Sequence, residues 1–144
     1  MVSSVSLRLH GVMGITCVFF DVGGTLGTVD AQLQLHPFLD TRVLLESLRA
    51  PGRRFGVISN TPATMKSAGL VALLEKAGIA DLFEANIVIA SADAAKPKPH
   101  AAIYEFAAKR AGVDLTECMF VGEDIAEVIG ARLAGMNAQL KPRH

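Results

Sequence analysis

The sequence has no excess of charge of either sign. Its 144 residues include 14 basic and 14 acidic side chains, which cancel. Proteins that bind nucleic acid through its phosphates usually carry a basic surplus, and disordered tails often carry blocks of like charge. Neither feature is present, so we expect no nucleic-acid-binding surface. With 51% hydrophobic residues, a chain of this length can bury a substantial core.

Cysteine is scarce, and long hydrophobic runs are missing. Cys17 and Cys118 lie in short apolar runs with neither metal-ligand spacing nor a disulfide framework, so we expect core packing in a cytoplasmic, reducing environment. No run reaches the about 18 apolar residues that a membrane span needs. Residues 1–14 contain no hydrophobic stretch of signal-peptide length. We expect them to be an N-terminal extension, with Met13 as an alternative start, and residues 15–144 to be a single domain.

Short apolar runs alternate with stretches of helical periodicity along the chain. The apolar runs predict strands over 15–20, 54–59, 85–91, 118–122 and 136–140. The periodic stretches predict helices over 38–50, 64–78, 99–112 and 124–135. In the first helix, the spacing places Leu39, Val43, Leu44 and Leu48 on one buried face. Fully apolar strands that alternate with helices predict an α/β fold, a parallel sheet of about five strands covered on both faces.

Polar side chains follow the predicted strands at their carboxyl ends, where such sheets bind ligands. Asp21, Ser59, Ser91 and Glu123 occupy these positions. A carboxylate that ends an apolar strand is unfavourable unless another group compensates it. After Asp21, the glycine-rich segment "VGGT" forms a turn whose backbone N–H groups can bind an anion.

Further charged residues accompany these strand ends. Lys98 precedes a predicted helix, while Asp124 and Glu127 follow Glu123 in the segment "VGEDIAE". A hydroxyl and an ammonium can hold phosphate oxygens, and acidic side chains can hold a hard divalent cation. Together these residue types indicate a site for a phosphoryl group and a cation.

Each of these residues also has a simpler alternative role. Asp21 could be a solvated turn residue, and Lys98 a solvated loop cation. Ser59 could cap the next helix, and Asp124 could stand at a helix N-terminus, where the dipole favours it. Glu127 could be an exposed helix residue.

Two segments resemble motifs of the haloacid dehalogenase superfamily of hydrolases, most of which are phosphatases with an aspartate nucleophile. "DVGGT" resembles the first motif, normally DxDGT, and "VISN" resembles the second, with Ser59 as its hydroxyl. The resemblance covers about residues 15–140. It implies a three-layer, doubly wound, Rossmann-like core.

The third and fourth motifs follow in the family's order. The third is a lysine before proline and a helix, often K-P-x-x-x-I-F, and Lys98 fits that spacing to Ile103 whereas Lys96 does not. The fourth usually reads GDxxxD or GDxxxxD. Here Glu123 and Glu127 fit the shorter form, with glutamate in both acidic positions.

The resemblance implies how the phosphoryl group would be bound. Asp21 would attack phosphorus and form an aspartyl-phosphate, which divides one difficult step into two. Ser59, the Asn60 backbone and the Gly24 N–H would lie against the phosphate. Lys98 would neutralise both the phosphate and the nucleophile.

The resemblance also implies a Mg²⁺ cofactor. Asp21 would bind the metal together with the backbone carbonyl of Gly23. Glu123 would be a further direct ligand, supported by Asp124 or Glu127.

The sequence departs from the family pattern in two places. Gly23 replaces the aspartate that, in the family's phosphatases, protonates the leaving group and later activates water. Acid–base catalysis of this kind contributes typically about 10²–10⁴-fold. In the fourth motif, the longer Glu123 replaces aspartate, although Mg²⁺ demands near-ideal geometry.

A cap domain has no room in the sequence. The intervals from Thr25 to Ser59 and from Ser59 to Lys98 are each filled by a helix, a strand and short connections. We therefore expect a capless, open site. It would admit a large or macromolecular phosphorylated substrate, or be closed by another subunit of a homo-oligomer.

Three functions remain open at this stage. The first is a Mg²⁺-dependent phosphatase that favours good leaving groups, with Asp30, in a loop near the site, as a candidate substitute proton donor. The second is a weak or inactive relative that binds phosphate, metal or a protein partner. Phosphoryl transfer to an acceptor other than water is a third, lesser alternative.

Overall fold

A parallel sheet forms the centre of the molecule. The computed structural model describes residues 14–142, so the predicted extension, except Gly14, and the alternative start at Met13 lie outside the described residues. The strand order is β5-β4-β1-β6-β7, and every neighbouring pair in this sheet is parallel. The strands are β1 (Cys17–Phe20), β4 (Arg54–Ser59), β5 (Val88–Ala90), β6 (Cys118–Gly122) and β7 (Asn137–Leu140). The predicted five-stranded α/β sheet is confirmed.

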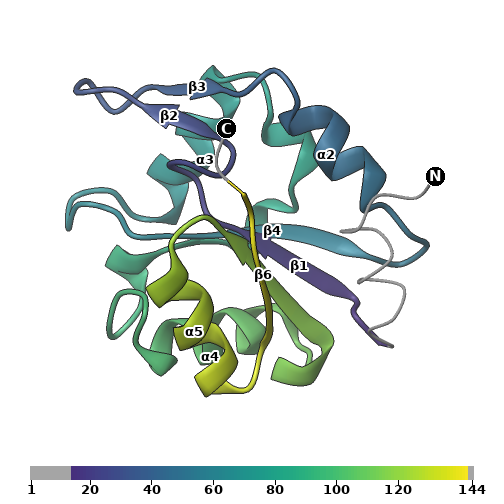
Figure 1. Ribbon diagram of the computed structural model, residues 1–144. Coiled ribbons are helices and arrows are strands. Elements are labelled where there is room, and N and C mark those ends of the chain that lie inside the picture. Colours follow the sequence, from purple (N-terminus) through teal and green to yellow (C-terminus); the bar gives the residue numbers. More distant parts are fainter. Residues whose placement is uncertain (1–13, 143–144) are drawn as a thin grey trace.

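Helices cover both faces of this sheet. They are α2 (Thr41–Ser47), α3 (Ser67–Lys76), α4 (Ala101–Ala111) and α5 (Ile125–Ala134). In Figure 1, α2 and α3 lie above the sheet and α4 and α5 below it. Short 3₁₀ turns occupy Ala80–Leu82, Ala85–Ile87, Ser91–Asp93 and Leu115–Glu117. The three predicted layers are therefore present.

Strand β1 lies in the middle of the sheet, with β4 on one side and β6 on the other. All four of its side chains are buried, which explains its uninterrupted apolar sequence. Phe20 packs edge-to-face on Phe55, toward α2 and α3. Cys17 and Cys118 are free thiols opposite each other in the β1–β6 register, and both are buried, as the sequence predicts. This central position fixes the end of β1 within the site.

The second core lies on the other face, beneath α4 and α5. Tyr104 packs edge-to-face on Phe120, and the alanines of α4 allow that helix to approach the sheet closely. Both helices end at a glycine in the left-handed conformation, Gly112 and Gly135. These ends lie within one or two residues of the predicted ones.

The buried face predicted for the first helix is wrong in part. Leu39 is 103% exposed and Val43 70% exposed, whereas Leu45 and Leu48 are buried. The helix begins at Thr41, whose hydroxyl donates a hydrogen bond of 2.7 Å to the Leu26 carbonyl. This buried polar contact fixes the rotation of the helix, and leucine periodicity alone does not reveal it.

A β-hairpin that the sequence does not predict follows the turn after β1. It pairs β2 (Gly27–Val29) with β3 (Leu35–Pro37) in antiparallel register. The strands are short and contain glycine and proline, so they carry little strand signal. In Figure 1 the hairpin projects at the upper left, at the carboxyl-end edge of the main sheet.

The predicted strand over 85–91 is shorter in the structure. Its first part is a 3₁₀ turn and its last residue begins another, which leaves β5 over Val88–Ala90.

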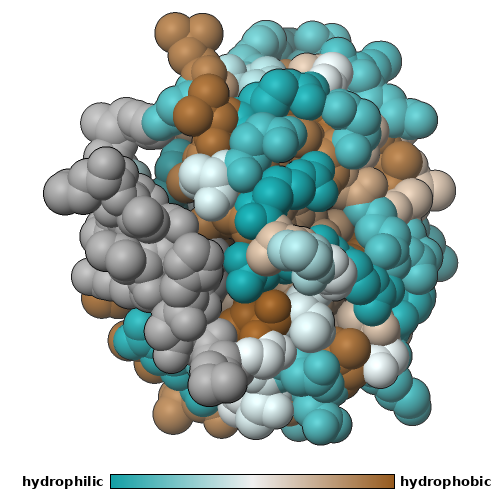
Figure 2. Space-filling view, turned by 90° about the vertical axis from the view of Figure 1, so that its right-hand side faces the viewer, coloured by the Kyte–Doolittle hydropathy of each residue, from teal (hydrophilic) through white to brown (hydrophobic). Residues whose placement is uncertain are grey.

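The edge of the sheet at the amino ends of the strands lies opposite the hairpin (Figure 1). This edge faces the viewer in Figure 2, where hydrophilic residues predominate. Among residues 14–142, no helix is long and apolar enough to span a membrane.

Candidate active site

The carboxylate of Asp21 stands at the carboxyl end of the central strand. Its backbone N–H donates to the Val121 carbonyl at 3.0 Å, which continues the β1–β6 ladder. The chain then turns sharply, because the Val22 carbonyl accepts bonds from Thr25 and Leu26 at 3.1 and 2.8 Å. Asp21 is thus held by the sheet on one side and by a closed turn on the other, and it is buried.

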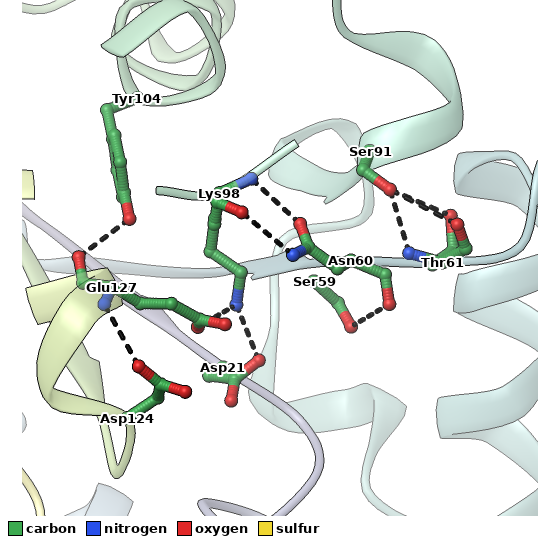
Figure 3. A network of polar contacts seen from close by, with 9 residues as sticks. All are labelled: Asp21, Ser59, Asn60, Thr61, Ser91, Lys98, Tyr104, Asp124 and Glu127. Atoms are coloured by element: carbon green, nitrogen blue, oxygen red, sulfur yellow. Dashed lines mark hydrogen bonds and ion pairs between the residues drawn. The ribbon is translucent and has the colours of Figure 1, made fainter. Parts of the chain in front are cut away.

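Lys98 lies between two carboxylates. Its ammonium nitrogen is 2.6 Å from Oδ1 of Asp21 and 2.8 Å from Oε1 of Glu127, and its side chain is 1% exposed (Figure 3). The solvated alternatives for Lys98 and Glu127 are therefore wrong. With all three groups ionised, two carboxylates and one ammonium leave one negative charge in excess.

Asn60 positions Lys98 through its backbone. Asn60 Oδ1 accepts from the Lys98 N–H at 2.9 Å, and Asn60 Nδ2 donates to the Lys98 carbonyl at 3.1 Å. This two-point contact joins the loop before α4 to the end of β4. The sequence predicts a role for the Asn60 backbone but not for its side chain, although the place of Asn60 directly after Ser59 is a signal.

Helix α5 brings Glu127 into the site. Asp124 caps this helix, since its Oδ1 accepts from the N–H groups of Ala126 and Glu127 at 2.9 and 3.2 Å. The helix-terminus alternative for Asp124 is the one observed. Burial raises the pKa of Glu127, and the neighbouring Lys98 ammonium partly opposes that increase. Tyr104, which the sequence analysis does not identify, supports this turn by donating to the Glu127 carbonyl at 2.7 Å.

Ser59 ends β4 beside this cluster. Its side chain is largely buried, and its hydroxyl makes one long contact of 3.5 Å to the Asn60 carbonyl. It does not cap the next helix, because Lys66 occupies the N-cap position of α3. Two residues after Ser59, the Thr61 N–H donates a hydrogen bond of 2.8 Å to the hydroxyl of Ser91, which follows β5. Ser91 therefore shapes the loop that presents Ser59.

The two glycines after Asp21 differ in their surroundings. Gly24 has φ +82, and a Cβ there would stand 2.6 Å from Oε1 of Glu123, so the turn and this carboxylate touch. The Gly24 N–H donates to the Gly27 carbonyl at 2.8 Å, so in this arrangement it is engaged within the turn. A Cβ on Gly23 would meet Val29 Cγ2 alone, at 4.0 Å. Space for a side chain exists there, and glycine leaves it empty.

Oxygen donors at this end of the sheet are compatible with Mg²⁺. Within residues 14–142, no three His, Cys, Asp or Glu side chains converge as a ready-made metal cluster. Mg²⁺ does not require one, since it is usually held by one or two carboxylates together with water and substrate oxygens. The Asp21 carboxylate and the Glu123 carboxylate flank one turn, and the Gly23 carbonyl belongs to that turn. The negative excess around Lys98 also favours a cation.

Asp30 is poorly placed as a substitute acid. Its carboxylate accepts from the N–H groups of Gln32 and Gln34 at 2.9 and 3.0 Å and lies 2.8 Å from His36 Nε2. The hydrogen bond to His36 and those to the backbone lower the pKa of Asp30, which favours its ionised form. These contacts do not support a role for Asp30 as the proton donor.

A cavity of about 300 Å³ opens above these residues. Asp21, Ser59, Asn60 and Glu127 line its polar end. Its other lining residues are Val22, Gly23, Val29, Leu33, Thr61, Pro62, Met65, Leu70 and Leu73. Of the residues predicted at separate strand ends, Asp21 and Ser59 therefore share one concave site, whereas Ser91 and Glu123 are not among its lining residues.

Comparison with protein families identifies one match over most of the chain. Residues 26–135 match the model of the haloacid dehalogenase-like hydrolases. Among curated proteins, a phosphatase from Mycobacterium tuberculosis, MT3486, is 38% identical over 105 residues, which are 72% of this chain and 46% of that protein. A phosphoglycolate phosphatase from Xylella fastidiosa is 31% identical over 141 residues, 92% of this chain and 59% of that protein. The chain spans about half the length of these relatives.

Solved structures agree with this match. An uncharacterised protein from Listeria monocytogenes superposes with a TM-score of 0.72 at 28% identity, covering 85% of this chain and 76% of that one. A phosphatase of the same superfamily from Thermococcus onnurineus gives 0.63 at 29% identity, covering 75% of this chain and 47% of that one.

Proposed function

The chain belongs to the haloacid dehalogenase-like hydrolases, and from this premise we propose that it is a Mg²⁺-dependent phosphatase with Asp21 as its nucleophile. Its curated relatives include phosphatases, so a phosphorylated substrate is the natural expectation. The single observation that carries the proposal is the buried contact between Lys98 and Asp21 at 2.6 Å. An ammonium held against a carboxylate at the open end of a central strand is suited to orient a nucleophile and neutralise a phosphoryl group.

The first step forms a bond between Asp21 and phosphorus. One carboxylate oxygen attacks as the bond from phosphorus to the ester oxygen breaks, and the leaving group departs with that electron pair. Lys98 offsets charge on the transferring group, and the Ser59 hydroxyl donates to one of its oxygens. In the second step water attacks phosphorus, the bond to Asp21 breaks, and inorganic phosphate leaves.

Mg²⁺ would be held by the Asp21 carboxylate, the Gly23 carbonyl and Glu123, and when bound it supplies positive charge near the phosphoryl oxygens. Asp124 and Glu127 are assigned lesser roles toward the metal, because one caps α5 and the other pairs with Lys98. The excess negative charge around Lys98 would otherwise repel a phosphate dianion.

Gly23 shapes the range of substrates. No side chain at this position can donate a proton to the leaving oxygen, so the departing group takes its proton from water. Esters whose leaving group is stable as an anion, such as aryl and acyl phosphates, depend least on such a donor. We therefore expect activity toward these esters and little toward simple alkyl phosphates.

A direct test compares para-nitrophenyl phosphate hydrolysis by the wild type and by Asp21→Asn, with and without Mg²⁺. The wild type should be active in the presence of Mg²⁺ and the variant inactive. Glu75→Gln, which changes an exposed acid on α3, is the matched control and should keep wild-type activity. Equal rates in wild type and Asp21→Asn would refute the proposal.

The absence of an acid at Gly23 favours a second candidate function. The chain would then bind phosphate, metal or a protein partner without turnover. Phosphate together with Mg²⁺ would raise the melting temperature, because a ligand that binds the folded state stabilises it. Substantial hydrolysis that Asp21→Asn abolishes would exclude this candidate.

A further inference from the structure

We propose that the cavity above Asp21 selects phosphate esters whose organic group is apolar, uncharged and about the size of a substituted phenyl ring. This inference rests on the proposed phosphatase function, since it assigns a substrate class to the same site. It arises from the part of the cavity that lies beyond the phosphate-binding end.

The outer wall of the cavity is built from apolar side chains of two separate segments. Val29 and Leu33 come from the β2–β3 hairpin, and Met65 comes from the loop before α3. Leu70 and Leu73, which are buried residues of α3, close the wall behind them. A substrate group that enters this space removes apolar surface from water on both sides, which favours binding.

Charge on the lining is of one sign. Its ionisable members are Asp21 and Glu127, both at the phosphate end, and the lining residues include no lysine or arginine. Lys98 already pairs with both carboxylates and is 1% exposed. A second anionic group on the substrate would leave water without gaining a partner, which is strongly unfavourable. The wall therefore disfavours an anionic organic group as well as favouring an apolar one.

Leu33 stands at the tip of the hairpin in an uncommon backbone conformation. Its φ is 59°, in the left-handed region that glycine or asparagine adopts more readily. Asp30 closes the tip, since its carbonyl accepts from the Leu33 N–H at 3.0 Å and its carboxylate binds two further backbone N–H groups. The Leu33 side chain, 46% exposed, is therefore held at the cavity mouth by a fixed loop.

The size of the cavity matches a small organic group. About 300 Å³ lies at the lower end of ligand pockets, which range over roughly 300–1,000 Å³. This volume accommodates a phosphoryl group with one substituted ring. A small aryl phosphate ester is the occupant that we infer from this volume, the charge and the wall chemistry.

Binding of two non-hydrolysable phosphonates tests the inference without requiring turnover. The probes are 4-ethylbenzylphosphonate and 4-(carboxymethyl)benzylphosphonate, which share the phosphonate and the ring and differ by one carboxylate. Dissociation constants are measured by calorimetry with Mg²⁺ present. The ethyl compound should bind at least about tenfold more tightly, because the wall offers the carboxylate no partner.

Leu33→Lys supplies the missing cation at the cavity mouth. Lysine carries the same backbone penalty as leucine at this φ, so the substitution isolates the side chain. The preference for the ethyl compound should shrink to near equality. Leu133→Lys, which changes an exposed leucine on α5 outside the cavity, is the matched control and should retain the wild-type ratio.

The outcomes separate this inference from the proposed function. Equal affinities in the wild type, tighter binding of the carboxylate compound, no binding of either compound, or a ratio that Leu33→Lys leaves unchanged would each overturn the selectivity. Selective binding without hydrolysis of any ester would overturn the phosphatase proposal and leave the selectivity supported.

Discussion

Replacing Gly23 with aspartate should restore a proton donor to the site and raise the hydrolysis rate of alkyl phosphates. The backbone tolerates the change, because Gly23 is not among the glycines with positive φ. A Cβ at this position meets Val29 Cγ2 alone, at 4.0 Å, which is an ordinary van der Waals distance. The new carboxyl would project into the cavity that Asp21 and Val29 line.

The size of the effect follows from two opposing terms. Positioned acid–base catalysis contributes typically about 10²–10⁴-fold. The added acid joins Asp21 and Glu127, and their negative charge raises its pKa and so favours the protonated donor, but it also weakens phosphate binding. We therefore expect the lower end of the range, about 100-fold in kcat for an alkyl ester such as phenethyl phosphate. With para-nitrophenyl phosphate the increase should be small, because nitrophenolate leaves without a proton.

Steady-state kinetics on both esters provide the assay. Gly23→Asn is the matched control, since it fills the same space without an acidic proton, and its rates should stay near the wild type. Equal rates for Gly23→Asp and Gly23→Asn on the alkyl ester, with both variants folded, would refute the assignment of Gly23 as the missing acid position.

Three further predictions concern charged side chains. Lys98→Met should abolish activity and lower the free energy of unfolding by about 3 kcal/mol, measured by urea denaturation, because two carboxylates lose their shared buried partner. Glu123→Gln should raise the Mg²⁺ concentration for half-maximal activity, because this carboxylate is assigned to the metal. Arg54 donates to Glu84 at 2.6 and 3.0 Å, and this hydrogen bonding lowers the pKa of Glu84. That pair stabilises the fold above the ordinary glutamate pKa of 4.5 and ceases to do so as the pH falls through the lowered pKa. In Glu84→Gln, the free energy of unfolding should therefore decrease less steeply as the pH is lowered, and this loss with falling pH is the acid limb of the stability curve.

Contrary results for these variants are equally specific. An unchanged urea midpoint in Lys98→Met would contradict the buried charge network. A Glu123→Gln variant with wild-type Mg²⁺ dependence would remove that residue from the metal site. An acid limb that Glu84→Gln leaves as steep as before would show that another carboxylate controls acid unfolding.

The main sheet could be predicted because its strands are uniformly apolar. Burial on both faces leaves no polar alternation, so residues 15–20 and 118–122 stand out from the helices around them. The end of β6 was predicted to the residue. The hairpin could not be predicted, because Gly27–Val29 and Leu35–Pro37 pair mostly with each other and bury few side chains.

Helix α2 shows where periodicity is insufficient. The helical spacing of apolar residues over 38–50 selected Leu39 and Val43, which are exposed. The helix is rotated by the hydrogen bond from Thr41 to the Leu26 carbonyl, a contact between segments that are distant in sequence. Local patterns contain no information about such a partner.

Within the site, strand ends predicted which residues converge but not how they pair. The positions of Asp21 and Ser59 followed from parallel topology, which gathers carboxyl ends at one edge. Lys98 was selected over Lys96 by its resemblance to the third motif of the family. The two hydrogen bonds between the Asn60 side chain and the Lys98 backbone, and the ion pair of Lys98 with Glu127, depend on side-chain geometry that only the folded chain provides.

Detection of a phosphoryl group on Asp21 tests the central proposal most directly. The protein is mixed with acetyl phosphate and Mg²⁺, quenched in acid and analysed by intact mass and peptide mapping. Because Gly23 cannot activate water, the intermediate should persist long enough to appear as one added phosphoryl group on the peptide that contains Asp21, and it should be absent from Asp21→Asn. Release of phosphate without any adduct on Asp21, or an adduct that persists in Asp21→Asn, would contradict the account.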